Sequence, residues 1–227
     1  MHCPNCRSTW RVRTITMGVL LGLGLPLKPL VEATQDWSRR GLGCSDNACL
    51  AAALASRFDY TNTYFHRFPR LDLRDIPEEL LGAVEFVSCS DVLEHIPPPV
   101  QPALIGLADI LKPGGFAVIS VPVADAGDTR EYYPRMRTWD VVDGSVVWTD
   151  EDGIGHTDNS PEFHGGPGQT LAFRAWGELS MLSSLEASGF ALIPLPDCPE
   201  LGVPQINSSG VFLARLSVQR PLTNREP

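Results

Sequence analysis

One short stretch of the chain gathers side chains that can exchange protons or bind a ligand. Ser90, Asp91, Glu94 and His95 stand at the end of an apolar segment, residues 83–90, that predicts a buried strand. A carboxylate and an imidazole so placed can act as general acid and base, and a loop after a strand carries them over a ligand cleft. The alternative is the N-cap of a helix with a solvated charge pair.

A glycine-rich segment, residues 40–46 (RGLGCSD), is a second candidate for ligand binding. Gly41 and Gly43 let the backbone approach a ligand, because glycine has no side chain to keep the ligand away. Ser45 or Asp46 can open the helix that follows, and helix N-termini favour anionic groups. The alternative is an ordinary loop before a helix.

A third candidate, His164, lies between Phe163 and the segment GGPG, residues 165–168. An imidazole beside such a turn can serve as a base on the substrate side or belong to a loop that closes over the ligand. The alternative is an exposed histidine in a turn. Residues 124–170 are polar and rich in predicted loops, so we expect them to form a lid or a substrate-side insertion.

The elements that must position these residues alternate between strands and helices. Apolar residues at three-and-four spacing predict a helix over 100–111, and segment 116–123 is almost wholly apolar, as in a strand covered on both faces. The other predicted elements are helices over 47–57 and 176–188 and strands over 58–65, 83–90, 190–195 and 210–217. This order predicts an α/β fold with a mostly parallel sheet, helices on both of its faces and an antiparallel pair of C-terminal strands.

Residues 88–122 (SCSDVLEHIPPPVQPALIGLADILKPGGFAVISVP) carry a resemblance to a known family. A strand ends in a VLEH turn, a helix follows, and LKPGG leads into the next strand. This block resembles the central part of class I S-adenosylmethionine-dependent methyltransferases of the small-molecule type. The resemblance extends more weakly over residues 41–216. Over this range the sequence looks like a divergent branch of these methyltransferases. It implies a Rossmann-like fold, S-adenosylmethionine as cofactor and a small-molecule or saccharide-like acceptor.

The resemblance also implies which residues contact the cofactor. Asp46 would receive its amino group, Asn62 or His66 its ribose and Asp72 its adenine, while Asp91 and Val92 with His95 would lie near the methionine end or the adenine. The implied set is Gly41, Gly43, Asp46, Asn62, Asp72, Leu73, Ser90, Asp91 and Val92. The sequence departs from the family in two places. The glycine segment has two glycines in place of three, and no carboxylate ends the strand predicted over 58–65.

Methyl transfer to oxygen or nitrogen needs a nucleophile aligned with the methyl group, and often a base that takes its proton. His95 and His164 are the candidate bases, and Glu94 is the third. The missing third glycine and the missing carboxylate also fit a different class of function. In that alternative the chain is a catalytically inactive, methyltransferase-like binding or assembly module.

Charge and composition narrow the range of partners. Eighteen basic residues stand against 27 acidic ones, which gives a net charge of −9. No basic run exceeds two residues, so we expect neither nucleic-acid binding nor a membrane-surface role. The six cysteines are not spaced like a secreted disulfide scaffold, and we therefore expect a cytoplasmic protein.

We expect residues 1–40 to form an irregular N-terminal region before a methyltransferase-like domain over 41–219 and a tail over 220–227. The apolar segment 17–27 follows Arg7, Arg11 and Arg13, as in a signal peptide, but is shorter than the ~20 residues that span a bilayer. The alternative is a helix or strand packed on the domain.

Cys3 and Cys6 form a C-x-x-C pair that resembles the first half of a zinc ribbon. A structural zinc site needs four ligands, and no second C-x-x-C follows in the sequence. The sequence therefore predicts no bound metal.

Overall fold

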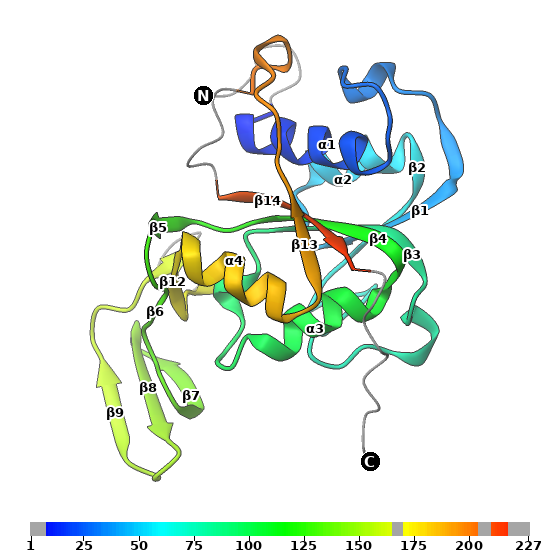
Figure 1. The fold of residues 1–227 in the computed structure, drawn as a ribbon. Coiled ribbons are helices and arrows are strands. Elements are labelled where there is room, and N and C mark those ends of the chain that lie inside the picture. The colour runs from blue at the N-terminus through cyan, green and yellow to red at the C-terminus, as the bar shows by residue number, and fades with distance from the viewer. Residues whose placement is uncertain (1–7, 165–169, 204–209, 218–227) are drawn as a thin grey trace.

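A six-stranded sheet forms the centre of the molecule, in the order β13-β14-β4-β3-β1-β2 (Figure 1). The structure is a computed structural model that describes residues 8–164, 170–203 and 210–217. The strands are β1 Asp36–Cys44, β2 Phe58–Thr63, β3 Val84–Ser90, β4 Leu111–Ser120, β13 Phe190–Ile193 and β14 Val211–Leu216. Strands β2, β1, β3 and β4 are parallel, whereas β14 and β13 are antiparallel. The predicted mostly parallel sheet with an antiparallel C-terminal pair is confirmed.

Helices cover both faces of this sheet, as predicted. α1 (Trp10–Gly22) and α2 (Ala48–Ala55) lie on one face, and α3 (Gln101–Ile110) and α4 (Glu178–Ala187) lie on the other (Figure 1). Under α1 and α2, the ring of Phe86 stacks on Phe116 with centroids 5.9 Å apart and meets Phe58 edge-on at 5.6 Å. Leu104 and Leu107 of α3 are fully buried against the other face. Burial of side chains on both sides of β3 and of the second half of β4 explains the apolar sequences of these segments.

The N-terminal region is not irregular in its described part. α1 spans Trp10–Gly22, and its N-cap Thr9 accepts a hydrogen bond from the backbone nitrogen of Val12 at 3.2 Å. The helix packs against β4 and β14, and a Cβ atom on Gly22 would overlap the ring of Phe116. The N-terminal apolar segment therefore belongs largely to a helix packed on the domain, the second of the two alternatives. Cys3 and Cys6 lie outside the described residues.

The glycine segment belongs to a strand rather than to a loop. β1 begins at Asp36 and runs through Gly41 and Gly43 to Cys44. The helix after it is capped by Asn47, whose side chain accepts from the backbone nitrogen of Leu50 at 3.0 Å, and not by Ser45 or Asp46. The LKPGG motif also lies within a strand, β4, where Gly114 has a φ of +76°. Both motifs thus contribute to the sheet itself.

Residues 124–170 contain more regular structure than their polar composition predicts. β7 (Met136–Val142), β8 (Ser145–Asp150) and β9 (Gly155–Asp158) form an antiparallel sheet that projects from the main body (Figure 1). The shorter strands are β5 Val123–Asp125, β6 Arg130–Glu131, β10 Phe163–His164, β11 Thr170–Leu171 and β12 Arg174–Gly177. Tyr133, Val146 and Phe173 form a small separate core. We refer to residues 123–177 as the insertion.

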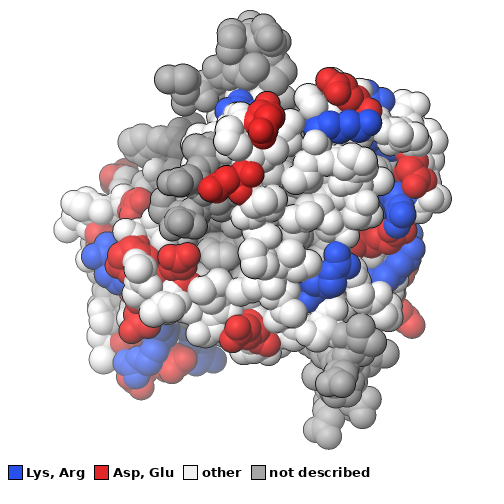
Figure 2. Space-filling view, turned by 45° about the horizontal axis from the view of Figure 1, so that its top comes forward, with Lys and Arg blue, Asp and Glu red and all other residues white. Residues whose placement is uncertain are grey.

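The described surface carries charges of both signs. On the face shown in Figure 2, lysine and arginine side chains are dispersed among acidic ones and do not gather into one patch on the part of the chain that is described. No helix among the described residues is long and apolar enough to cross a membrane.

Candidate functional site

A cavity of about 630 Å³ opens where three parallel strands end. Register brings these ends together, because Cys44 of β1 lies opposite Thr63 of β2 and Cys89 of β3. The carboxyl edge of a parallel sheet is where α/β proteins bind ligands. The strand-end segments contribute Cys44, Ser45, Thr63, Tyr64, Phe65, His66, Leu71, Asp72, Leu73, Arg74, Asp91, Val92, His95, Ile96 and Pro97 to the lining. The insertion contributes Trp139, Thr170, Leu171 and Phe173.

Four of the predicted cofactor contacts line this cavity: Asp72, Leu73, Asp91 and Val92. Gly41, Gly43, Asp46, Asn62 and Ser90 do not. Ser90 instead hydrogen-bonds the hydroxyl of Ser120 at 2.9 Å. His66, the alternative to Asn62, does line the cavity. The residues predicted from the sequence thus lie at or near this edge of the sheet, but only some of them face the cavity.

The glycine segment is held by a buried polar network beneath the cavity. The carboxylate of Asp46 accepts hydrogen bonds from the hydroxyls of Tyr60 and Ser88. Asn62 is bonded to the backbone of Asp46 through both ends of its amide, at 3.0 and 2.9 Å. Burial raises the pKa of Asp46 to about 6, although the two hydroxyls act in the opposite direction. A Cβ on Gly43 would overlap the Tyr60 hydroxyl, so this network requires glycine there.

Ser45 connects the network to the cavity. Its φ is +57°, a left-handed conformation that glycine adopts at lower cost. Its backbone nitrogen donates to the carbonyl oxygen of Thr63 at 2.7 Å, which fixes the loop after β1 to the end of β2. Asp46 and Asn62 do not line the cavity, but their hydrogen bonds hold the loop after β1, which does.

Asp72 presents a carboxylate on the next segment of the lining. The backbone nitrogen of Arg74 donates to it at 2.9 Å, and the Arg74 guanidinium lies 3.3 Å away. Burial alone would raise the pKa of Asp72, but the hydrogen bonds and charge of Arg74 outweigh it and hold that pKa below its usual value. Asp72 is thus an anionic acceptor at neutral pH.

Asp91 follows β3 and adopts a φ of +54°. Its carboxylate forms an ion pair with Arg11 of α1 and accepts a hydrogen bond from Ser120 at 3.2 Å. Both ion-pair side chains are about one-third exposed, at 34% and 33%. Arg11 thereby brings the N-terminal helix to the edge of the cavity. No sequence signal identifies this contact, because the two residues are separated by 80 positions.

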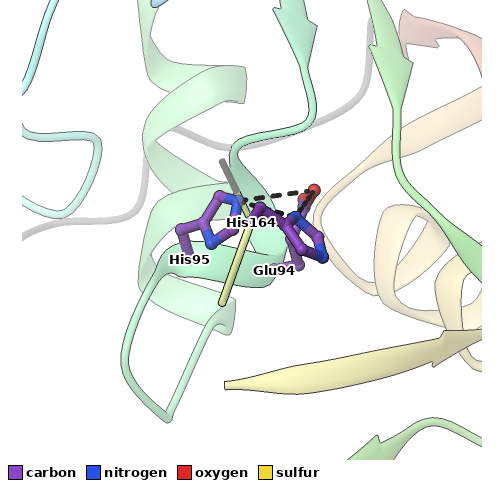
Figure 3. A group of neighbouring side chains, drawn as sticks. All are labelled: Glu94, His95 and His164. Atoms are coloured by element: carbon purple, nitrogen blue, oxygen red, sulfur yellow. Dashed lines mark hydrogen bonds and ion pairs between the residues drawn. The ribbon is translucent and has the colours of Figure 1, made fainter. Parts of the chain in front are cut away.

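The three predicted catalytic residues come together although His164 is distant in sequence. His95 Nε2 lies 3.1 Å from His164 Nδ1, and Glu94 Oε1 lies 3.7 Å from each of these nitrogens (Figure 3). Glu94 is fully buried, and neither of its oxygens accepts a hydrogen bond from a described residue. Burial raises the pKa of Glu94 to about 8. Burial likewise lowers the pKa of His95, whose Nδ1 lies 2.8 Å from the carbonyl oxygen of Leu171.

Strand β12 supports this cluster from the insertion side. The backbone nitrogen of Phe173 donates to the carbonyl oxygen of Glu94 at 2.8 Å. The buried Arg174 donates to the carbonyl oxygen of Leu93 and to the carboxylate of Glu131, the latter at 2.6 Å. The short 3-10 helix Leu93–His95 is therefore fixed between β3 and β12. Sequence reasoning missed Arg174, since nothing in its neighbourhood marks it as buried.

The fold of this chain is shared with solved structures. A protein from Clostridium acetobutylicum described as an S-adenosylmethionine-dependent methyltransferase aligns with a TM-score of 0.55, covering 92% of this chain and 93% of that one at 10% identity. This chain has the fold of S-adenosylmethionine-dependent methyltransferases. The resemblance of residues 88–122 is thus confirmed at the level of the fold.

Two further structures with this fold contain ligands. An N1-methyltransferase from Burkholderia thailandensis, with bound 1,6-didemethyltoxoflavin and S-adenosylhomocysteine, has a TM-score of 0.51 at 14% identity, with 92% of this chain and 78% of that chain covered. An amino pentose methyltransferase from Micromonospora echinaspora, bound to S-adenosylmethionine, has a TM-score of 0.51 at 12% identity over 92% of each chain. Neither a protein-family model nor a curated protein matches the sequence.

Proposed function

We propose that the chain is an S-adenosylmethionine-dependent methyltransferase that acts on a small-molecule or saccharide-like acceptor. The observation that carries this proposal is the cavity of about 630 Å³ at the carboxyl ends of β1, β2 and β3. Its volume falls within the ~300–1,000 Å³ range of ligand pockets. Its lining combines apolar side chains with two carboxylates, Asp72 and Asp91, which suits a ligand that has an aromatic base, hydroxyls and an amino group.

The residues of the lining fit the parts of this cofactor. Asp72 is an anionic acceptor for hydroxyl or amino donors, and Leu73 beside it offers an apolar surface to a planar base. Asp91 and Val92 offer the same pairing at the end of β3. The cofactor supplies an electrophilic methyl group on a sulfonium. The protein's own task is to hold that group against the acceptor and to exclude water.

The acceptor lies on the insertion side of the cavity in this proposal. Trp139 and Phe173 meet edge-on with centroids 5.3 Å apart, and both line the cavity. Aromatic faces of this kind bind the apolar surface of a sugar or a heterocycle. His95 lines the same part of the cavity, so an acceptor hydroxyl or amine would reach the cluster of Glu94, His95 and His164.

One observation supports a second candidate, a binding module without catalysis. The glycine segment contributes only Cys44 and Ser45 to the cavity, and Gly43 is covered by the Tyr60 hydroxyl rather than open to a ligand. A module of this kind would lack cofactor binding. The two candidates therefore differ in a property that is measured without knowing the acceptor.

Titration calorimetry with S-adenosylmethionine and S-adenosylhomocysteine separates the two candidates. We expect micromolar binding of both ligands to the wild type. Asp72→Asn should weaken binding about tenfold, because a hydrogen bond to a charged group contributes ~1.5–3 kcal/mol. Asp59→Asn, an exposed carboxylate of β2 that does not line the cavity, is the matched control. Absence of binding to either ligand would exclude the methyltransferase function.

A further inference from the structure

We propose that Glu94, His95 and His164 bind a divalent transition-metal ion at the acceptor end of the cavity. The ligand atoms are one carboxylate oxygen and two imidazole nitrogens, which come from the 3-10 helix after β3 and from strand β10 (Figure 3). This donor set is that of catalytic zinc sites with two histidines and one glutamate, and imidazole also suits iron and cobalt. Zinc is therefore the probe of choice.

The distances between the ligand atoms match those around a metal ion. His95 Nε2 and His164 Nδ1 are 3.1 Å apart, and Glu94 Oε1 is 3.7 Å from each. A point equidistant from these three atoms lies about 2.0 Å from each of them, whereas Zn–N and Zn–O bonds measure ~2.0–2.2 Å. An ion at these bond lengths lies at or slightly above the plane of the three atoms, and coordination positions on its exposed side stay open.

The orientation of the two imidazoles also suits a cation. The carbonyl of Leu171 can only accept, so His95 carries its proton on Nδ1 and keeps the lone pair on Nε2. His164 Nδ1 donates to this lone pair at 3.1 Å, and its Nε2 lies 3.6 Å from the carboxylate of Glu162. Binding of an ion would move the His164 proton from Nδ1 to Nε2, where the Glu162 carboxylate faces it, as carboxylates do at metal-bound histidines. The two facing nitrogens and the Glu94 carboxylate would then all bind the cation.

Burial of Glu94 is the third observation. Its side chain is fully inaccessible, and neither oxygen has a hydrogen-bond donor among the described residues. Arg174, the nearest buried cation of β12, donates to Glu131 and to the carbonyl of Leu93 instead. A buried carboxylate that has only imidazole contacts at 3.7 Å and no hydrogen bond from another described residue is costly, and buried charges are ordinarily paired or bound to metal. An ion in the cluster removes this cost.

The position of the cluster connects the ion with the reaction. His95 and Leu171 line the cavity, whereas Glu94 and His164 do not, and in this proposal the open coordination positions lie on the His95 side, towards the acceptor. If the proposed methyltransferase function holds, on which this role rests, an acceptor hydroxyl occupies one of them. Its pKa falls and its proton passes to water. The oxygen then forms a bond to the methyl carbon as the carbon–sulfur bond breaks, and S-adenosylhomocysteine leaves. His95 and His164 thus bind the ion rather than take the proton.

Zinc titration of the full chain tests the site. The protein is stripped of metal with a chelator, and Cys3→Ser/Cys6→Ser serves as the background so that the C-x-x-C pair does not contribute. We expect one zinc per chain, and His95→Ala or His164→Ala should weaken binding about 100-fold or more, since even outer-shell changes cost ~10–100-fold. Glu162→Gln should cost about tenfold. His156→Ala is the matched control, because this residue stacks on Trp148 outside the cluster.

The outcomes are distinct. Failure of the background protein to bind zinc would overturn the proposal, and so would zinc binding by His95→Ala and His164→Ala that equals the binding of the background protein. Glu94→Gln keeps the shape of the side chain and, compared by circular dichroism, shows whether lost binding reflects lost folding. S-adenosylhomocysteine binding measured in chelator is expected within threefold of its value with zinc. Loss of that binding alone would contradict the methyltransferase function and not the metal site.

Discussion

The guanidinium of Arg11 in α1 forms an ion pair with the carboxylate of Asp91 at the end of β3. This pair joins the N-terminal helix to a residue that lines the cavity, although 80 positions separate the two in the chain. Asp91 also accepts a hydrogen bond from Ser120 and has a positive φ, so its position is fixed from several sides. The N-terminal helix α1 thus helps to fix the position of a residue that lines the cavity.

Arg11→Met should release the Asp91 carboxylate and weaken the binding of S-adenosylhomocysteine about three- to tenfold. The free energy of unfolding should fall by only about 1 kcal/mol or less, because partly exposed ion pairs contribute little. Calorimetry and urea denaturation measure the two effects. Arg13→Met is the control, since this residue of the same helix donates to the carbonyl of Gly202. Equal affinities of Arg11→Met and Arg13→Met for S-adenosylhomocysteine would show that Arg11 does not position Asp91.

Gly43→Ala should destabilise the protein by roughly 1–3 kcal/mol, the usual cost of overpacking a well-packed interior. The new methyl group would overlap the Tyr60 hydroxyl and crowd the side chains of Asn62 and Asp46. Gly155→Ala is the control, because a Cβ there meets open space. Urea denaturation of both variants measures the difference. A Gly43→Ala protein as stable as Gly155→Ala would mean that the buried network is looser than described.

The pKa of Asp46 predicts a pH dependence of stability. Its folded value of about 6 lies above 3.8, the ordinary pKa of an aspartate side chain, so the folded state binds the proton more tightly than the unfolded state does. The contribution of protonated Asp46 to the free energy of unfolding is fully present below pH ~4 and is lost as the pH rises through ~6. Over this pH range the free energy of unfolding of the wild type should fall by on the order of 2–3 kcal/mol relative to that of Asp46→Asn, which has no carboxyl group to titrate at this position. This figure follows from 1.36 kcal/mol per pKa unit.

Denaturation of both proteins at pH 4, 5, 6 and 7 measures this loss. Asp59→Asn controls for the removal of a carboxylate, because Asp59 is exposed on β2. Parallel pH profiles of wild type and Asp46→Asn would contradict the raised pKa.

Gly22→Ala tests whether α1 belongs to the domain. A Cβ at this position would overlap the ring of Phe116 in β4, which should displace the end of the helix. We expect a loss of about 1–3 kcal/mol in the free energy of unfolding. If residues 10–22 were a separate leader segment, the substitution would leave stability unchanged, and thermal unfolding distinguishes the two results.

Patterns local in sequence were enough to predict the fold. Helix 100–111 is read from its 3.6-residue period, and α3 spans Gln101–Ile110. The apolar segment that ends at Ser90 is β3, because both of its faces are buried. The insertion was missed as a sheet because β7 and β8 mix apolar and polar side chains without regular alternation and pair chiefly with each other and with β9. Hairpins of this kind show little of the alternation that sequence analysis relies on.

Candidate site residues could be predicted where ionisable side chains directly follow predicted strands in the sequence. Asp72, Asp91 and His95 all line the cavity, since each follows a predicted strand. Arg11 and Trp139 were missed, because tertiary packing alone brings Trp139 into the cavity lining and Arg11 to the lining residue Asp91. The approach of His164 to His95 likewise depends on the return of the insertion to the sheet, which no local pattern encodes.

A crystal structure of the chain with S-adenosylhomocysteine tests the central claim most directly. The account predicts the ligand in the cavity at the carboxyl ends of β1, β2 and β3, with Asp72 and Asp91 hydrogen-bonded to its polar groups. Its sulfur should point towards His95 and the insertion. A ligand bound elsewhere, or a cavity that stays without ligand at saturating concentration, would contradict the account.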